Sequence, residues 1–324
     1  MLDISKKTKT LRTAMAKAVL KLKPETIQLI HQHKIPKGDP FSVAKVAAIQ
    51  AAKNTSQMIP YCHPLPLDFV DCRFSAEGGC SSGAEIGDSR IEIETEVKAI
   101  YTTGVEMEAL TAASIAALTL YDMMKMLDET MEIVGVKLVE KKGGKSDFKE
   151  SFETPLRAAV LAMSDSIASG KKDDLSGRLI VDRLKEEGVD VVDYKIIPDD
   201  TERIKKELIG YVDEMKVDLV LTTGGTGFSP RDFAPEATRE VLQRLIPGIP
   251  EALRAHGQDR TPYSMLSRGI AGIRGRTLIV NLPGSKKGVA DSLDALFPAV
   301  LHSFKMLRGG GHQRREKDTA RNES

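Results

Sequence analysis

The sequence predicts two domains: one of mixed helices and strands, then one with a mostly parallel sheet covered by helices. The chain has 324 residues, enough for two domains of roughly 100–200 residues each. Residues 157–307 alternate strand and helix patterns, which is typical of a parallel sheet with helices on both faces. Residues 1–150 contain short mixed segments and one long helical stretch. Between them, residues 149–155 are polar, carry a proline and show no apolar periodicity, which predicts a linker.

The first half has four clear elements. Pro24 opens a predicted helix over residues 24–33, because proline suits the first helical position. Residues 41–53 are alanine-rich and predict a second helix. Residues 90–97 alternate apolar and acidic side chains, which indicates a half-exposed strand. Residues 106–126 predict a long helix.

The second half predicts a parallel sheet. Its predicted strands are residues 157–164, 189–197, 218–223 and 277–282, and its predicted helices are residues 177–187, 204–215 and 237–245. Ligands of such sheets bind beyond the carboxyl ends of the strands. The segments that follow Met163, Ile197, Thr223 and Leu282 are therefore candidate binding segments.

Composition excludes several classes of protein. Lys and Arg number 47 and Asp and Glu 46, so the basic excess of a general nucleic-acid binder is missing. No apolar run approaches the ~18 residues of a membrane span, and charges near the N-terminus do not fit a signal peptide. The three cysteines, Cys62, Cys72 and Cys80, form no C-x-x-C pair and no closed disulfide framework. We therefore expect a reduced cytoplasmic protein that binds neither nucleic acid nor membrane.

The sharpest motif follows the predicted strand over residues 218–223. Gly224, Gly225 and Gly227 come directly after it, and glycines there let backbone N–H groups approach an anion closely. Arg231 and Asp232 add a phosphate donor and a magnesium ligand. The alternative is a tight turn with an exposed ion pair, but the position after a buried strand favours an anion site. The spacing matches neither a P-loop nor a dinucleotide fingerprint.

Two further segments reach the same predicted sheet edge. Gly284 and Ser285 follow the last strand with two lysines, and Asp199 and Asp200 follow the strand that ends at Ile197. Anion donors beside carboxylates suggest a nucleotide bound with magnesium. The polar loop over residues 164–177 is equally compatible with a ligand contact and with an ordinary surface loop.

The long helix of the first half carries a possible catalytic row. Glu108 and Asp122 are fourteen residues apart and Lys125 is three residues further on, so all three fall on roughly one face. Spacing alone favours a solvated face with an Asp–Lys pair worth only ~0.3–0.5 kcal/mol.

Two more segments of the first half are ambiguous from their residues alone. Lys141–Ser146 imitates the end of a P-loop, but Val139 stands where the first glycine is required. A basic phosphate contact and a solvated turn both remain open there. His63 lies between prolines, and a lone histidine is more often structural than a metal ligand.

Taken together, the first half resembles the cyclic pyranopterin monophosphate synthase family of molybdenum-cofactor biosynthesis. The matching segments are Lys37-Gly-Asp39, Ala51-Ala-Lys53, Ile59-Pro-Tyr-Cys-His-Pro-Leu65, Thr103-Gly-Val-Glu-Met-Glu-Ala-Leu-Thr111, Tyr121-Asp-Met-Met-Lys125 and Lys141-Lys-Gly-Gly-Lys-Ser146. The second half resembles the molybdopterin adenylyltransferase family. Its matching segments are Ile197-Pro-Asp199, Thr222-Thr-Gly-Gly-Thr-Gly227, Pro230-Arg-Asp232, Pro235-Glu-Ala-Thr238, Ser267-Arg268 and Asn281-Leu-Pro-Gly-Ser285.

The first resemblance implies a ferredoxin-like α+β domain in a homo-hexamer with active sites between subunits. It implies conversion of (8S)-3',8-cyclo-7,8-dihydroguanosine 5'-triphosphate to cyclic pyranopterin monophosphate with release of diphosphate, and no definite cofactor. Its implied roles make Lys125 the central acid or base, held by Asp122 and assisted by Lys37, which reverses the conclusion from spacing. The implied substrate-binding residues are Lys53, His63, Glu106, Glu108 and Lys145.

The second resemblance implies an α/β three-layer domain that transfers AMP from ATP to molybdopterin with Mg2+. Asp199 and Asp232 match the family's functional aspartates and would hold magnesium and nucleotide. The implied contacts to the pterin phosphate or the nucleotide are Gly224, Gly225, Thr226, Gly227, Gly284 and Ser285. Asp165 and Ser267 are weaker candidates.

The resemblances imply a bifunctional enzyme and set its boundaries. We predict a synthase domain over 1–150, a linker over 151–156, an adenylyltransferase-like domain over 157–308 and a disordered tail over 309–324. One alternative is a synthase fused to a non-catalytic molybdopterin-binding module. Another is an unrelated magnesium-dependent nucleotide enzyme, which would make the first half structural.

The sequence departs from the families' usual residues at a few positions. Lys142 replaces a usual Ser and Asp147 a usual Gly in the basic turn, so these two bear on its phosphate contacts. Met124 replaces a common Cys. In the second half, Ala234 replaces a frequent Thr and Lys286 a frequent Pro, and neither change removes an ionisable group that the family expects.

Overall fold

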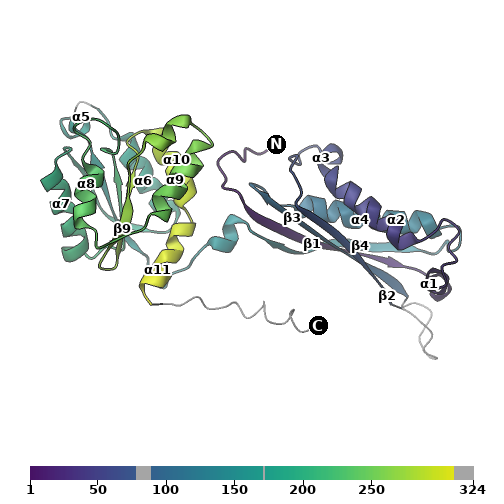
Figure 1. Cartoon of the computed structure of the whole chain (residues 1–324). Coiled ribbons are helices and arrows are strands. Elements are labelled where there is room, and N and C mark those ends of the chain that lie inside the picture. The colour runs from purple at the N-terminus through teal and green to yellow at the C-terminus, as the bar shows by residue number, and fades with distance from the viewer. Residues whose placement is uncertain (78–88, 171, 310–324) are drawn as a thin grey trace. The chain divides into compact units, whose positions relative to one another are not determined.

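The structure, a computed structural model, describes residues 1–77, 89–170 and 172–309. It divides into two compact units, Met1–Asp147 (unit 1) and Phe148–Ser324 (unit 2) (Figure 1). Cys80 and nearly all of the predicted tail fall outside the described residues. No helix in the described ranges is both long and apolar enough to span a membrane.

Unit 1 is a four-stranded antiparallel sheet in the order β2-β3-β1-β4, with its long helices α2 and α4 beside it (Figure 1). The elements are β1 (Thr10–Lys21), α1 (Pro24–His31), α2 (Pro40–Lys53), α3 (Thr55–Met58), β2 (Phe69–Glu77), β3 (Arg90–Tyr101), α4 (Glu106–Met124), β4 (Glu132–Lys142) and η1 (Lys145–Phe148). The four elements predicted from periodicity are all present, with ends shifted by a few residues.

Small side chains let α4 pack closely on the sheet. Ala109, Ala112 and Ala116 are fully buried on α4, and alternate residues of β3 such as Ile91 and Ile93 are buried in the same core. Alanine keeps the helix axis near the strands while contributing helix propensity. This packing fixes both ends of α4 relative to the sheet.

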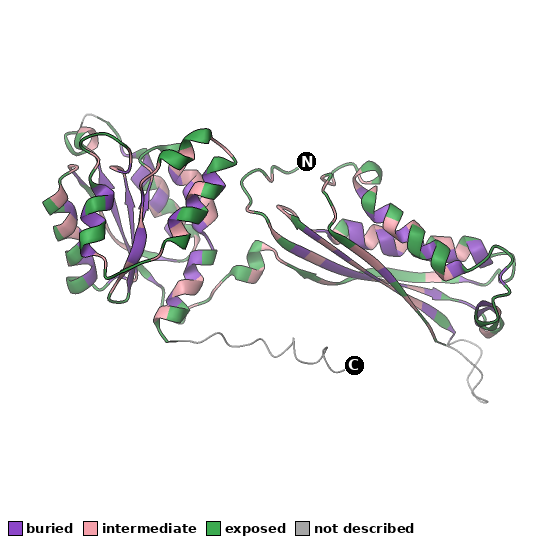
Figure 2. Ribbon diagram, in the orientation of Figure 1, coloured by how far each residue is buried: buried purple, intermediate pink, exposed green. Residues whose placement is uncertain are grey.

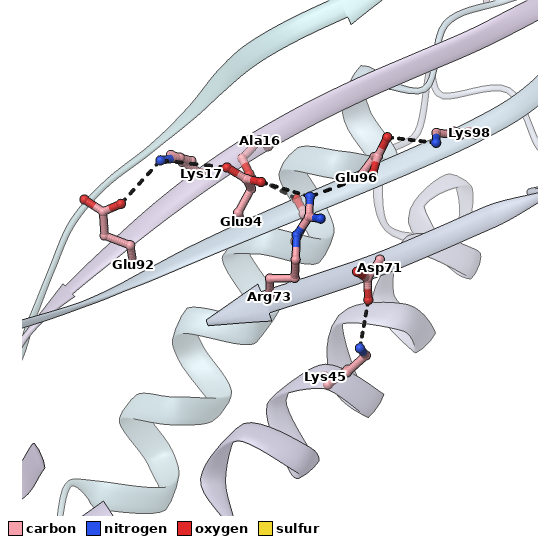
Figure 3. A network of polar contacts seen from close by, with 10 residues as sticks. Ala16, Lys17, Lys45, Asp71, Arg73, Glu92, Glu94, Glu96 and Lys98 are labelled. Carbon is pink, nitrogen blue, oxygen red and sulfur yellow. Dashed lines mark hydrogen bonds and ion pairs between the residues drawn. The ribbon is translucent and has the colours of Figure 1, made fainter. Parts of the chain in front are cut away.

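The intervening residues of β3 carry charge. Glu94 pairs with Arg73 of β2 at 3.0 Å, and Glu92 pairs with Lys17 of β1 at 3.3 Å (Figure 3). Lys98 pairs with Glu96 at 2.9 Å. The first two pairs join neighbouring strands and favour the observed register modestly, whereas Lys98 and Glu96 lie on the same strand. The alternation of residues 90–97 therefore separates a packed face from a charged one, as predicted.

Unit 2 is a six-stranded sheet in the order β6-β5-β7-β10-β9-β8. Pairs among β5, β6, β7 and β10 are parallel, whereas β8 and β9 are antiparallel additions at one edge. The strands are β5 (Arg157–Met163), β6 (Asp190–Ile197), β7 (Leu219–Thr223), β8 (Arg244–Leu245), β9 (Ala271–Arg274) and β10 (Thr277–Leu282). The mostly parallel sheet predicted from the sequence is confirmed.

Helices cover this sheet on both faces and form two separate apolar cores, one on each side of the buried strands (Figure 2). The longer ones are α6 (Leu175–Glu186), α7 (Thr201–Ile209), α8 (Ala234–Val241), α9 (Gly248–Gln258) and α10 (Lys286–Leu296); the shorter ones are α5 (Asp165–Ala168), η2 (Gly210–Glu214), η3 (Pro262–Leu266), η4 (Ala299–Leu301) and α11 (His302–Leu307). The helix predicted over 237–245 is wrong in its second half, because Arg244 and Leu245 pair with β9 as a short strand.

The polar segment between the two predicted domains packs against unit 2. Leu156 is buried, and Phe152 packs against the core cluster that contains it. The carboxylate of Glu150 lies 2.6 Å from Nδ1 of His302 and also pairs with Lys305. The residues next to the predicted linker are thus tied to α11.

Candidate functional site

A polar cavity of roughly 520 Å³ opens at the carboxyl ends of the parallel strands of unit 2. Its lining residues are Ala162, Met163, Ser164, Asp165, Ser166, Ile167, Ser169, Asp174, Ser176, Asp199, Thr223, Gly224, Gly225, Ser229, Arg231, Asp232 and Gly284. The segments after β5, β6, β7 and β10 all contribute, as the sequence predicted. The loop over 164–177, whose role the sequence left open, forms much of one wall.

Two glycines bring the turn after β7 against its neighbours. Gly224 has φ +98°, and a Cβ there would overlap the carbonyl oxygen of Met163. Gly225 has φ +61°, and a Cβ there would meet the carboxylate of Asp199. Only glycine fits this close approach without strain. The turn therefore brings backbone groups to the cavity wall beside Asp199.

Asp199 is half-buried, and one oxygen of its carboxylate is fully buried and unsatisfied. Its Oδ1 has no hydrogen-bond partner. Burial, followed by the negative charges of Asp232 and Asp165, raises the pKa of Asp199 to about 6. Arg231 lies 3.6 Å from Asp165 and is largely exposed. The cavity wall thus carries more carboxylates than cationic groups, which favours a bound cation.

The number of these carboxylates suits a magnesium ion whose remaining ligands are water and phosphate oxygens. Within the described residues, no group of three or more His, Cys, Asp or Glu side chains is arranged to hold a metal ion. Mg2+ commonly takes one or two carboxylates and completes its shell with waters and phosphate oxygens. Asp199 and Asp232 can supply that number.

The predicted anion contacts are only partly in the cavity. Gly224, Gly225 and Gly284 line it, whereas Thr226, Gly227 and Ser285 are not among the lining residues. Thr226 is buried. The Ser285 hydroxyl accepts a hydrogen bond from the Gly288 N–H at 3.1 Å and caps α10. Ser267, the weaker candidate, is likewise outside the lining.

Asp174 is a lining residue that sequence reasoning missed. It is buried, caps α6 by accepting from the Gly177 N–H at 2.7 Å, and accepts from the Tyr194 hydroxyl at 2.6 Å. Ser176 donates to the carbonyl oxygen of Gly284 at 3.0 Å. An Asp immediately before a helix is an N-cap signal that could have been used to place it.

In unit 1, Lys37, Asp122 and Lys125 form a lysine–aspartate cluster at the C-terminal end of α4. Asp122 Oδ2 lies 2.8 Å from Lys37 Nζ, and Oδ1 lies 2.8 Å from Lys125 Nζ. Hydrogen bonds from the two ammonium groups, Lys125 first, lower the pKa of Asp122 to about 2. Asp122 in turn raises the pKa of Lys125. Spacing alone assigned Asp122 and Lys125 to a solvated face with a simple ion pair. In the structure Asp122 also contacts Lys37, a lysine from outside the helix.

Cys62, Glu106, Glu108 and Lys141 form a glutamate cluster at the opposite end of α4. Glu106 pairs with Lys141 at 3.3 Å. Glu108 is only 3% exposed, accepts a hydrogen bond from Cys62 Sγ at 3.3 Å, and leaves Oε2 without a partner. Burial raises the pKa of Glu108, which favours its neutral form.

Of the other predicted residues of unit 1, Lys53 and Lys145 are exposed and His63 is half-buried. His63 Nε2 lies 2.9 Å from the carbonyl oxygen of Leu2, so the N-terminal segment covers part of it. Lys53 ends α2, and Lys145 begins η1. In the basic turn before η1, the Asp147 carboxylate accepts from the Gly143 N–H at 2.6 Å. Asp147, which stands where the family usually has Gly, therefore occupies the Gly143 N–H of this turn.

The two clusters are far apart within one chain. Glu106 and Asp122 are sixteen residues apart on α4, which at 1.5 Å per residue is about 24 Å. Lys37 precedes α2 and Cys62 follows α3, so the α2–α3 segment carries the chain from one cluster to the other. The structure thus brings Lys37, Asp122 and Lys125 together, and separates them from Glu106 and Glu108.

Comparisons with known proteins match both units. The MoaC family matches residues 1–144, and the family described as a probable molybdopterin binding domain matches residues 159–302. The chain is 43% identical over 312 residues to the molybdenum cofactor biosynthesis bifunctional protein of Chlorobaculum tepidum, covering 96% of each chain. It is 37% identical to the protein of that name from Synechococcus elongatus, covering 96% of this chain and 98% of the relative.

Separate relatives match single halves. The cyclic pyranopterin monophosphate synthase of Thermomicrobium roseum is 46% identical over 148 residues, covering 45% of this chain and 83% of the relative. Among solved structures, the molybdopterin biosynthesis enzyme MoaB from Thermus thermophilus is 44% identical, with 48% of this chain and 97% of that chain covered and a TM-score of 0.46.

We predict that Glu108 suppresses the reactivity of Cys62. Burial and then Glu108 raise the pKa of Cys62 to about 11, so Glu108→Gln should lower that pKa and increase the thiolate fraction at pH 9. Iodoacetamide alkylation of the Cys62 peptide, followed by mass spectrometry, should be severalfold faster in the variant. Glu132→Gln, at an exposed position of the same unit, is the control. An unchanged rate in Glu108→Gln would exclude the coupling.

We predict that Asp199→Asn stabilises unit 2 above pH 6. The folded pKa of about 6 exceeds the ordinary value of 3.8, so the anion destabilises the fold as the pH rises from 4 to 6. With solvent screening, the gain at pH 8 should be about 1 kcal/mol, or roughly 2–4 °C in melting temperature. Thermal unfolding at pH 8 and pH 4 checks this, because the difference should shrink at pH 4.

Magnesium provides the second arm of this measurement. Mg2+ should raise the melting temperature of the wild type at pH 8 and leave that of Asp199→Asn unchanged. Asp190→Asn, at an exposed carboxylate on the amino end of β6, opposite the carboxyl end that faces the cavity, is the control and should respond as the wild type does. Equal responses of all three proteins would remove Asp199 from the cation site.

Proposed function

The chain belongs to the family of bifunctional molybdenum cofactor biosynthesis proteins, and we propose that its two units catalyse two separate reactions of that synthesis. Unit 1 is a cyclic pyranopterin monophosphate synthase, which rearranges (8S)-3',8-cyclo-7,8-dihydroguanosine 5'-triphosphate and releases diphosphate. Unit 2 adenylates molybdopterin with ATP and Mg2+. We assign these activities to residues 1–150 and 157–308, joined by 151–156 and followed by a tail over 309–324.

The lysine–aspartate cluster supports acid and base chemistry in unit 1. Rearranging a purine-derived ring into a pterin requires several proton transfers, and a positioned acid or base contributes roughly 10²–10⁴-fold to the rate. Asp122 stays ionised at neutral pH and holds two ammonium groups in place. Lys125, whose pKa Asp122 raises, starts as the acid and becomes the base once it has given up its proton. Lys37 assists from the other side of Asp122.

The glutamate cluster and three further basic residues support binding of the triphosphate substrate. Lys53, His63 and Lys145 would hold its phosphates, and diphosphate is a leaving group that cations stabilise. Glu106 and Glu108 would contact the ring. A neutral Glu108 can donate a hydrogen bond through its unpaired oxygen, which an ionised carboxylate cannot do.

The separation of the clusters supports a site shared between subunits. About 24 Å along one helix is too far for one nucleoside triphosphate to contact both ends. A second copy of the chain would place the glutamate cluster of one subunit beside the lysine–aspartate cluster of another. The β-α-β-β-α-β order of unit 1 supports the assignment of a ferredoxin-like fold. We propose that the chain forms a homo-hexamer through this unit.

The cavity at the strand ends supports adenylyl transfer by unit 2. Its size suits a pterin or a nucleotide, and glycine turns present backbone N–H groups to phosphate. Asp199 and Asp232 would hold magnesium, which when bound neutralises phosphate charge. The observation that carries this proposal is the buried, unpaired Oδ1 of Asp199 in that cavity. The transfer would take place in this cavity, where the pterin, the phosphate and the cation come together. We also propose that the protein works in the cytoplasm.

Adenylation of molybdopterin by the full chain tests unit 2. With ATP and Mg2+, the wild type should give adenylated molybdopterin, detected by chromatography and mass spectrometry, and Asp232→Asn should lose at least about 100-fold. Lys125→Ala is the matched control, and its adenylation should equal that of the wild type. Bound molybdopterin without product would contradict the proposal and would favour a synthase fused to a binding module.

Complementation between variants tests the shared site of unit 1. Lys125→Ala and His63→Ala should each abolish most synthase activity. Mixed oligomers made by co-expression should regain about one quarter of wild-type activity, because a two-chain site receives an intact Lys125 from one chain and an intact His63 from the other at that frequency. Mixing either variant with itself is the control. Failure to recover activity in mixed oligomers would place the whole site within one chain.

A further inference from the structure

Arg268 connects three positions of the loop that follows the glycine turn of unit 2. Its backbone N–H donates to the carbonyl oxygen of Thr226 at 3.0 Å. Its Nε donates to the carbonyl oxygen of Gly227 at 2.7 Å, and its Nη2 donates to the carbonyl oxygen of Asp232 at 2.5 Å. One side chain therefore bridges two carbonyl groups that are five residues apart.

The loop between those two carbonyl groups carries the Asp232 carboxylate. The Asp232 N–H donates to the carbonyl oxygen of Ser229 at 2.9 Å, and Asp232 Oδ2 accepts from the Ser229 N–H at 2.8 Å. These bonds form a tight turn but do not attach it to the sheet. Arg268 attaches the chain before this turn, at Gly227, and its last residue, Asp232, to the segment that leads into β9.

A guanidinium is suited to this bridge and an ammonium is not. Nε and Nη2 form a planar fork that donates two bonds in fixed directions, whereas a lysine has a single nitrogen on a flexible stem. The remaining Nη1 pairs with Glu236 of α8. Arg268 contacts the backbone carbonyl oxygen of Asp232 and not its carboxylate, which therefore stays available to a cation or nucleotide.

The segment that carries Arg268 is itself held in place. Arg254 of α9 donates through Nη1 to the carbonyl oxygens of Ser267 and Gly269, at 3.3 Å and 3.2 Å. The backbone of Arg268 is therefore fixed on both sides. Its own side chain links this fixed segment to the Asp232 turn, and the Ala234 N–H, which donates to the carbonyl oxygen of Gly225 at 3.2 Å, holds the far end of the loop.

We propose that Arg268 is a positioning residue for the adenylyl transfer of unit 2, holding the Asp232 turn at the distance from Asp199 that a shared cation requires. The proposal rests on the function proposed above for this cavity. Arg268 lies outside the cavity lining and acts through Asp232. Its loss leaves every ligand contact chemically intact but lets the turn shift.

The test compares Arg268→Ala and Arg268→Lys with Arg239→Ala in the full chain. Arg239 is an exposed arginine of α8 outside the cavity and serves as the control. We expect kcat for adenylation to fall roughly 10–100-fold in Arg268→Ala, because a shift of about 1 Å is enough for such a loss. The KM for molybdopterin should change less than about twofold. Without substrates, Arg268→Ala should need several times more Mg2+ than the wild type to reach half of the rise in melting temperature that Mg2+ produces.

Rescue separates positioning from general stability. Free guanidinium at millimolar concentration should restore part of kcat in Arg268→Ala and change nothing in the control. Arg268→Lys keeps the charge and reaches only one carbonyl group, so its kcat should lie between those of wild type and Arg268→Ala, and it replaces Arg268→Ala if that variant fails to fold. An unchanged kcat and magnesium requirement in a folded variant would overturn the proposal, as would a loss of molybdopterin binding alone.

The wild type distinguishes this proposal from the one on which it rests. Absence of adenylated product from the wild type contradicts the proposed function of unit 2. Product from the wild type together with normal kinetics of both Arg268 variants contradicts only the role of Arg268. Glu236→Gln removes one contact of the same guanidinium and leaves its fork intact, so its kcat should stay within about twofold of wild type.

Discussion

The parallel pairing of β7 with both β5 and β10 is the interaction on which the cavity of unit 2 depends. Parallel strands end at the same edge, so segments that are far apart in the sequence begin their loops side by side. The close contact of Gly224 with the end of β5 follows from this pairing. So does the placement of Gly284 near Gly224. A small change in register would move every one of these loops.

The two proposed sites would bind anions in different ways. Unit 2 would use backbone groups and a wall of carboxylates, with a cation between protein and phosphate. Unit 1 would use ammonium groups directly, and Asp122 keeps two of them from repelling each other at short range. In both units a carboxylate with a strongly shifted pKa, lowered in Asp122 and raised in Asp199, marks the point where charge is concentrated.

In unit 1 the packing of α4 determines the spacing of the functional groups. A rigid helix carries Glu108 near one end and Asp122 near the other, and small buried residues fix it against the sheet. A helix holds such a distance far more constant than a loop can. The same rigidity that keeps the groups in place within a chain also prevents them from meeting there, which is the reason a second chain enters the proposed site.

The sequence by itself predicted the main elements of both units and the strand ends where ligands would bind, because hydrophobic periodicity and glycine spacing are local signals. Both families followed from the resemblance of whole motifs, which the family matches confirm. It did not reveal that Asp174 lines the cavity, that Ser285 is a helix cap, or that Arg268 bridges the Asp232 turn. The Ser285 cap is a local contact with Gly288, which an N-cap pattern could have predicted. The place of Asp174 in the cavity lining and the Arg268 bridge bring together residues distant in the chain. Tertiary packing alone decides such contacts, since burial and hydrogen-bond geometry depend on neighbours that no local pattern specifies.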